Sequence, residues 1–118
     1  MPRSIVVLLL SGLLLSTAQA RVISRNSLYG AIAYHDASGS SGFAVDRRSS
    51  REARVEALRL CGHPKCEIVA ALRSDCGAVA KGARKIITQR GATRQEAEAK
   101  ALRHCGEACE IVAWACTR

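Results

Sequence analysis

Apolar and polar residues alternate along this chain with two different periods, and the same order of periods occurs twice. Residues 29–35 and 66–73 are short apolar runs, which is typical of strands. Between them, residues 51–61 carry apolar side chains three and four positions apart, as in a helix that buries one narrow face. With a second short strand at residues 43–46, the pattern predicts strand, strand, helix and strand.

The predicted helix has start and stop signals. Ser49 and Glu52 have the spacing of a capping box, and Gly62 follows the helix where a left-handed residue commonly ends it. The face that we expect to be buried consists of Ala53, Ala57, Leu58 and Cys61.

The whole pattern then repeats, which indicates internal duplication. The segment CEIVA occurs at residues 66–70 and 109–113, and the two helices align without gaps at an offset of 44 residues. Thr93 and Glu96 repeat the capping box. We therefore expect one duplicated domain, with unit one at residues 29–75 and unit two at residues 76–118.

Two such units predict an α+β fold with two layers: one mostly antiparallel sheet of about six strands, with both helices on one face. The closing strands are apolar on both faces, and two helices cover only one face of a sheet. Something else must then cover the other face. The candidates are the N-terminal tether at residues 21–28, a second copy of the chain in a homodimer, and a foreign partner.

The first twenty residues have the features of a secretory signal peptide. Arg3 precedes an apolar run at residues 5–15, and small residues lead to a cleavage point after Ala20. The run is too short to span a bilayer comfortably, so we expect no stable membrane anchor, with an uncleaved anchor as the alternative. Export predicts a periplasmic or secreted location.

Six cysteines in an exported chain predict three disulfides. The duplication matches Cys61 with Cys105 and Cys66 with Cys109, so each unit has an equivalent pair around its helix-to-strand turn. The two remaining cysteines have no counterpart in unit one and pair by elimination. The predicted bridges are Cys61 with Cys66, Cys105 with Cys109, and Cys76 with Cys116. A zinc site built from thiolates of the two short pairs, with His63 and His104 nearby, is the alternative.

The motifs of common hydrolases and nucleotide-binding enzymes are absent from the sequence. With all thiols in bridges, no cysteine nucleophile is left. His35 beside Asp36 reads as a solvated loop pair rather than a catalytic dyad. We therefore expect a protein that is not an enzyme and that has no metal or cofactor.

A net charge of +8 favours acidic partners outside the cytoplasm. Nucleic-acid binding in vivo is not expected, because only 3% of the residues are aromatic and single-strand binders stack bases on aromatic rings. An anionic envelope polymer or surface is one partner class. The residues that would bind it are Arg51, Arg54, Arg94 and Arg103.

Two features point to a surface that binds protein. Residues 36–42 predict a long hairpin tip, three residues longer than its counterpart near residue 82, and function tends to lie on such loops. Trp114 is the only indole, and it is either a core residue or an interface anchor. The predicted partner-binding residues are His35, Asp36, Ser38, Ser40, Ser41 and Trp114.

The segments YGAIAY at residues 29–34, CGAVA at 76–80 and CEIVAWACT at 109–117, with the two glutamate- and alanine-rich helices, give the chain a family likeness. It resembles small secreted bacterial proteins grouped as domain of unknown function 4189. The resemblance covers residues 29–117 and implies export and an α/β fold with disulfides, but it carries no catalytic residues.

Together these observations predict a non-catalytic exported binding module. We expect a periplasmic inhibitor or immunity protein that occludes a secreted toxin or hydrolase, such as a peptidase or cell-wall enzyme. The alternative is a basic module that binds an anionic envelope polymer.

Overall fold

The computed structural model describes residues 27–118. The predicted signal peptide and all but the last two residues of the predicted tether lie outside the described residues. The elements are β1 (Tyr29–His35), β2 (Ser40–Arg47), α1 (Ser50–Cys61), β3 (Glu67–Arg73), β4 (Cys76–Lys81), β5 (Ile86–Gly91), α2 (Arg94–Cys105) and β6 (Glu110–Cys116). This order confirms the two β-β-α-β units of an α+β fold.

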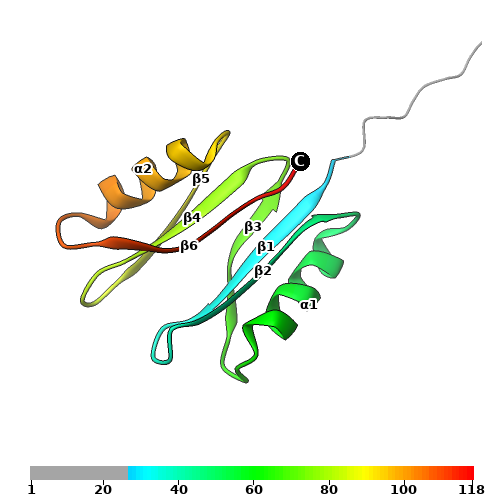
Figure 1. The fold of residues 1–118 in the computed structure, drawn as a ribbon, viewed down its shortest axis with the longest axis horizontal. Helices are drawn as coiled ribbons and strands as arrows, with labels where there is room; N and C mark the ends of the chain where they lie inside the picture. The colour runs from blue at the N-terminus through cyan, green and yellow to red at the C-terminus, as the bar shows by residue number, and fades with distance from the viewer. Residues whose placement is uncertain (1–26) are drawn as a thin grey trace, which may run out of the picture.

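The strands form two sheets, not the single sheet that was predicted. Their orders are β2-β1-β3 and β5-β4-β6, and all pairs are antiparallel. Helix α1 packs on the first sheet and α2 on the second, so the helices lie on opposite outer sides of the molecule (Figure 1). The prediction that both helices share one face is therefore wrong.

The second apolar face of each sheet is covered by the other unit. The residues between the sheets are Ile32, Ala70, Leu72, Val79 and Ala115, with Val69 and Val112 packed against them. Strands that are apolar on both sides need cover on both sides. A helix supplies it on the outer face, and the partner unit supplies it on the inner face.

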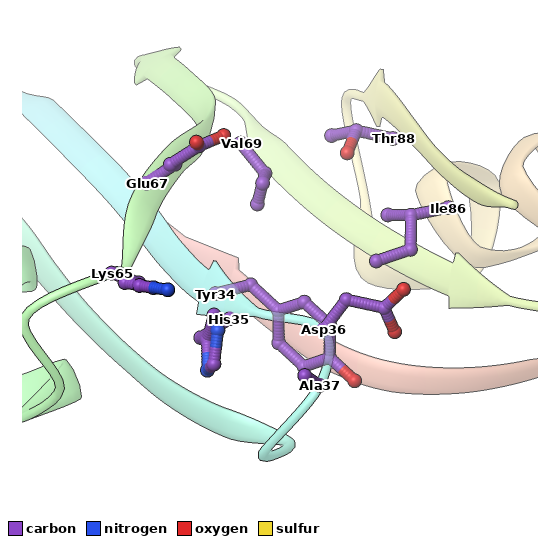
Figure 2. A pocket seen from close by; sticks show the side chains of 9 residues that line it. All are labelled: Tyr34, His35, Asp36, Ala37, Lys65, Glu67, Val69, Ile86 and Thr88. Atoms are coloured by element: carbon purple, nitrogen blue, oxygen red, sulfur yellow. The ribbon is translucent and has the colours of Figure 1, made fainter.

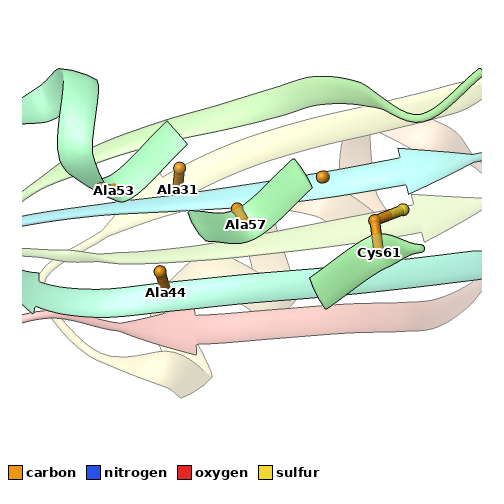
Figure 3. Close-up of a cluster of buried hydrophobic side chains, with 6 residues drawn as sticks. Ala31, Ala44, Ala53, Ala57 and Cys61 are labelled. Carbon is orange, nitrogen blue, oxygen red and sulfur yellow. The ribbon is translucent and has the colours of Figure 1, made fainter. Parts of the chain in front are cut away.

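Under each helix the core is made mainly of alanine. Ala53, Ala57 and Cys61 of α1 meet Ala31 and Ala44 of the sheet (Figure 3), and α2 repeats this arrangement. Such small side chains bring the helix close to the strands: a Cβ at Gly42 would lie 2.6 Å from the backbone carbon of Leu60.

The helix ends follow the predicted signals. Ser49 Oγ accepts a hydrogen bond from Glu52 N at 3.1 Å, and Thr93 Oγ1 accepts one from Glu96 N at the same distance. Gly62 has φ 72° and donates its N–H to the last turn of α1. One part of the predicted helix face was wrong, because Leu58 is 38% exposed. The buried face of α1 therefore consists of Ala53, Ala57 and Cys61.

The repeated CEIVA segment contains a register shift in both units. In β3, Ala70 pairs with Ile32 and Ile68 pairs with Ala33, which leaves Val69 as the extra residue. In β6 the same shift leaves Val112 extra. The bulge bends both closing strands in the same way.

All three predicted disulfides are present. Two of them join the end of a helix to the start of the following strand, and Cys76–Cys116 joins directly paired residues of β4 and β6. No free cysteine occurs among the described residues, so the zinc alternative loses its thiolate ligands. Neither helix within residues 27–118 is long and apolar enough to cross a membrane.

The long hairpin tip was predicted wrongly. The loop after β1 contains only residues 36–39, and the corresponding loop of unit two, residues 82–85, is equally long. The three extra residues of unit one lengthen its strands, because β1 and β2 have seven and eight residues whereas β4 and β5 have six each. The unit-one hairpin is therefore longer in its arms.

Candidate functional site

Four connections lie toward one end of the molecule, which we call the loop end. They are the hairpin loops at residues 36–39 and 82–85 and the disulfide-bridged turns at residues 62–66 and 106–109 (Figure 1). The chain terminus at Arg118 and the short β3–β4 connection lie at the opposite end. Antiparallel strands and helices that all run the length of the molecule produce this separation.

Two side-chain contacts join these connections to one another. The imidazole of His35, at the end of β1, stacks on that of His63 in the bridged turn, with ring centroids 3.9 Å apart and planes inclined by 17°. Lys81, at the end of β4, donates to Asp36 Oδ1 at 2.9 Å. The first contact links the hairpin of unit one to its own turn, and the second links it to unit two.

The hairpin loop is also fixed internally. Ser38 Oγ lies 2.7 Å from His35 Nδ1, donates to Ser40 Oγ at 3.0 Å and accepts from Ser40 N at 3.2 Å. Gly39 N donates to His35 O at 2.8 Å. The loop thus has a defined shape before any partner arrives.

An open groove of about 590 Å³ lies beside this loop, between the edge strands β3 and β5 (Figure 2). Its residues come from both units, so it exists only when the two sheets pack together. The residues that line it are Tyr34, His35, Asp36, Ala37, Lys65, Glu67, Val69, Ile86 and Thr88.

One ion pair of the loop end shifts the pKa of its lysine. The hydrogen bond to Asp36 is the main cause that raises the pKa of Lys81 above its ordinary 10.5, and the charges of Tyr34 and Asp36 add to it. Lys81 and Asp36 therefore form an ion pair at the surface. His35 and Asp36 are adjacent in sequence, but they contact Ser38 and Lys81 rather than each other.

The predicted partner-binding residues are only partly brought together. His35, Asp36, Ser38 and Ser40 lie at the loop end, and Ser41 follows on β2. Trp114 lies beside the first turn of α2, far along β6 from the loop end, where the guanidinium of Arg94 sits 3.8 Å from the ring centroid. Trp114 is 40% exposed, so it is not a buried core residue. Its position beside α2 separates it from the loop end.

The four arginines proposed for anionic polymers do not share a surface. Arg51 and Arg54 are on α1, whereas Arg94 and Arg103 are on α2, on the opposite side of the molecule (Figure 1). Arg94 is also paired with Glu98 at 2.8 Å. This separation weakens the alternative of a single basic binding face.

Sequence reasoning missed the residues that complete the loop end, namely Lys65, Glu67, Lys81, Ile86 and Thr88. It considered His63 as a zinc ligand and as a catalytic candidate, and not as a neighbour of His35. The disulfide-bridged turns were the available signal, because each bridge holds its turn beside the hairpin loop of the same unit.

Comparison with known proteins decides the family. Residues 29–116 match the family model described as domain of unknown function (DUF4189). The chain belongs to the DUF4189 family. The match confirms the resemblance noted in the sequence and spans both units of the domain.

This DUF4189 domain is similar to a solved structure, described as the NMR structure of Rv1813c from Mycobacterium tuberculosis. The two chains are 34% identical with a TM-score of 0.61, and the similarity covers 91% of this chain and 97% of that chain. The search of curated proteins gave no match. The three disulfides indicate that this DUF4189 chain works outside the cytoplasm.

Proposed function

We propose that this chain is a non-catalytic exported binding module that holds a protein partner against its loop end. The partner is a secreted toxin or hydrolase, such as a peptidase or cell-wall enzyme, and the module acts as a periplasmic inhibitor or immunity protein. The observation that carries the proposal is the interlocking of the hairpin loop with its neighbours through the His35–His63 stack and the Lys81–Asp36 pair.

A rigid surface is the form that an inhibitor needs. Binding costs free energy for every loop and side chain that becomes ordered, and a preorganised loop avoids much of that cost. The bridge Cys61–Cys66 fixes the turn that carries His63, and Ser38 fixes the hairpin loop. A bulky hydrolase could close on such a surface without first ordering it.

The polar side chains of the loop end also contact one another. His35 Nδ1 is occupied by Ser38, His63 Nδ1 accepts from Lys65 N at 3.0 Å, and Asp36 is paired with Lys81. These side chains hold the loops in place.

The proposal is tested by affinity capture with oxidised protein and two matched variants. Ala37→Arg adds a long cationic side chain at the loop end, and Gln95→Arg adds the same group on exposed α2. Envelope extract from the source bacterium should yield one stoichiometric protein with the wild type and with Gln95→Arg, but not with Ala37→Arg. The captured protein should be a hydrolase or toxin whose activity falls when the module is added.

Recovery of no stoichiometric protein would contradict the proposal. So would a partner that Ala37→Arg retains as well as the wild type does, or a captured enzyme that stays fully active in the complex.

A further inference from the structure

We infer that the free edge of β5 at Ile86 and Thr88 is the docking site for an extended segment of the partner protein. The segment adds as a strand to the second sheet and places alternate side chains in the groove between β5 and β3. This inference rests on the proposed function, because it specifies how a protein partner is held.

The hydrogen-bond ladder shows which backbone groups of β5 face outward. Gly82 N donates to Lys85 O at 2.9 Å, which starts the ladder between β4 and β5. In an antiparallel pair, hydrogen-bonded and non-bonded pairs alternate. From the register, Ile87 and Gln89 bond to β4, and the N–H and C=O groups of Ile86, Thr88 and Arg90 point away from it.

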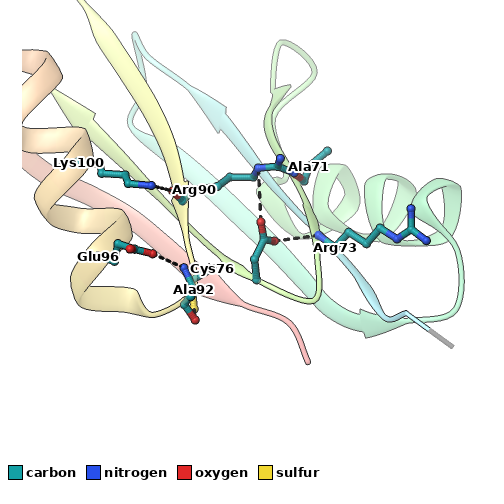
Figure 4. A network of polar contacts seen from close by, with 8 residues as sticks. Ala71, Arg73, Cys76, Arg90, Ala92, Glu96 and Lys100 are labelled. Atoms are coloured by element: carbon teal, nitrogen blue, oxygen red, sulfur yellow. Dashed lines mark hydrogen bonds and ion pairs between the residues drawn. The ribbon is translucent and has the colours of Figure 1, made fainter. Parts of the chain in front are cut away.

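Further from the loop end, side chains form hydrogen bonds with the outward backbone groups of the edge strands. Lys100 Nζ donates to Arg90 O at 3.3 Å, Arg90 Nη1 donates to Ala71 O at 3.2 Å, and Asp75 Oδ1 accepts from Arg73 N at 2.9 Å (Figure 4). No side chain within residues 27–118 reaches the backbone of Ile86 or Thr88 in this way. Edge strands are usually protected against pairing, so the unprotected part is the part available to a partner.

The groove lies where a new strand would place its side chains. Ile86 and Thr88 both line it, and Tyr34 and Val69 form apolar parts of its walls (Figure 2). A strand paired to β5 would direct every second residue toward these walls, because successive side chains of a strand point to opposite faces.

The charges of the bridged turn and of the start of β3 limit which segments can bind. Lys65 and Glu67 line the groove, and neither is in an ion pair with another residue of the described chain. Asp36, in contrast, is already paired with Lys81. The complementary occupant is an extended peptide with an apolar residue over Tyr34 and Val69, an acidic residue near Lys65 and a basic residue near Glu67.

A library of linear heptapeptides displayed on phage is the probe. Selection on the oxidised protein should enrich peptides with apolar residues at alternate positions and with both charge signs. Thr88→Pro removes an outward N–H that β4 does not use, and should weaken these peptides about tenfold, as expected for one lost hydrogen bond. Thr88→Val keeps the N–H and should bind them normally.

NMR of the wild type gives a second test that does not depend on the folding of Thr88→Pro. Binding of a selected peptide should slow hydrogen exchange at the Ile86 and Thr88 amides. Failure to enrich any peptide, equal binding by a folded Thr88→Pro, or protection at another edge would overturn the inference.

The two proposals can fail separately. A captured partner that fails to bind Ala37→Arg but binds Thr88→Pro normally would contradict docking at the edge of β5. It would still support the inhibitor proposal. If peptides bind at Thr88 but the protein captures no partner, docking at the edge of β5 is supported and the inhibitor proposal is contradicted.

Discussion

His35 and His63 stack face to face, with ring centroids 3.9 Å apart, although 28 residues separate them in the chain. The ring of His63 is fixed by a hydrogen bond within its own turn, because its Nδ1 accepts from Lys65 N. That nitrogen therefore carries no proton in the observed arrangement. The stack of the two rings therefore joins the hairpin loop to the bridged turn.

The Lys81–Asp36 pair predicts a dependence on alkaline pH. Because pairing raises the pKa of Lys81 in the folded chain, its stabilising effect is fully present below the ordinary value of 10.5 and is lost as the pH rises through the higher folded value. Lys81→Met should therefore lower the urea midpoint slightly at neutral pH, and the difference from wild type should shrink in alkali.

The matched control for this prediction is Lys85→Met. Lys85 is exposed in the hairpin loop of unit two and is in no ion pair with another residue of the described chain. Its replacement should change the urea midpoint less than Lys81→Met does at neutral pH. A Lys81→Met difference that grows in alkali would refute the link.

Gly42 should be the least replaceable glycine of unit one. An added Cβ would meet the backbone of Leu60 and Cys61, which cannot move without lifting α1 from its sheet. Gly42→Ala should cost about 3 kcal/mol in the free energy of unfolding. Gly39→Ala meets open space at φ 74° and should cost about 1 kcal/mol, through backbone strain alone. If urea titrations show equal losses of unfolding free energy for the two variants, the close approach of α1 to Gly42 does not limit the substitution.

The long disulfide should contribute most to stability. Cys76–Cys116 has a sequence separation of 40, whereas Cys105–Cys109 has one of 4. In the chain-entropy treatment, removal of the first pair by alanine should cost about 4 kcal/mol and removal of the second about 2 kcal/mol. Denaturant titrations of the two double variants provide the comparison, and the reverse order would count against an entropic origin.

Local features could be read from the sequence because they depend on nearby residues. Ser49 and Thr93 cap the helices as their spacing predicts, and the duplication correctly paired all six cysteines. The division into two sheets could not be read in this way. An apolar residue such as Val79 fits equally well against a helix or a second sheet, so its pattern does not say which element covers it.

The binding surface was harder still to predict. His35 and Asp36 were among the predicted residues, but the residues that they contact come from other connections. His63 lies in the bridged turn of the same unit and Lys81 lies in unit two, so only tertiary packing brings each pair together. Trp114 was chosen for its side chain alone, and its position beside Arg94 on α2 separates it from the loop end.

The most direct test of the loop end as the proposed binding surface is site-specific photo-crosslinking in the source organism. A benzophenone amino acid replaces Ala37 at the loop end in one strain and Gln95 on α2 in another. The account predicts one discrete protein adduct from position 37 and none from position 95. An adduct only from position 95, or none from either, would contradict it.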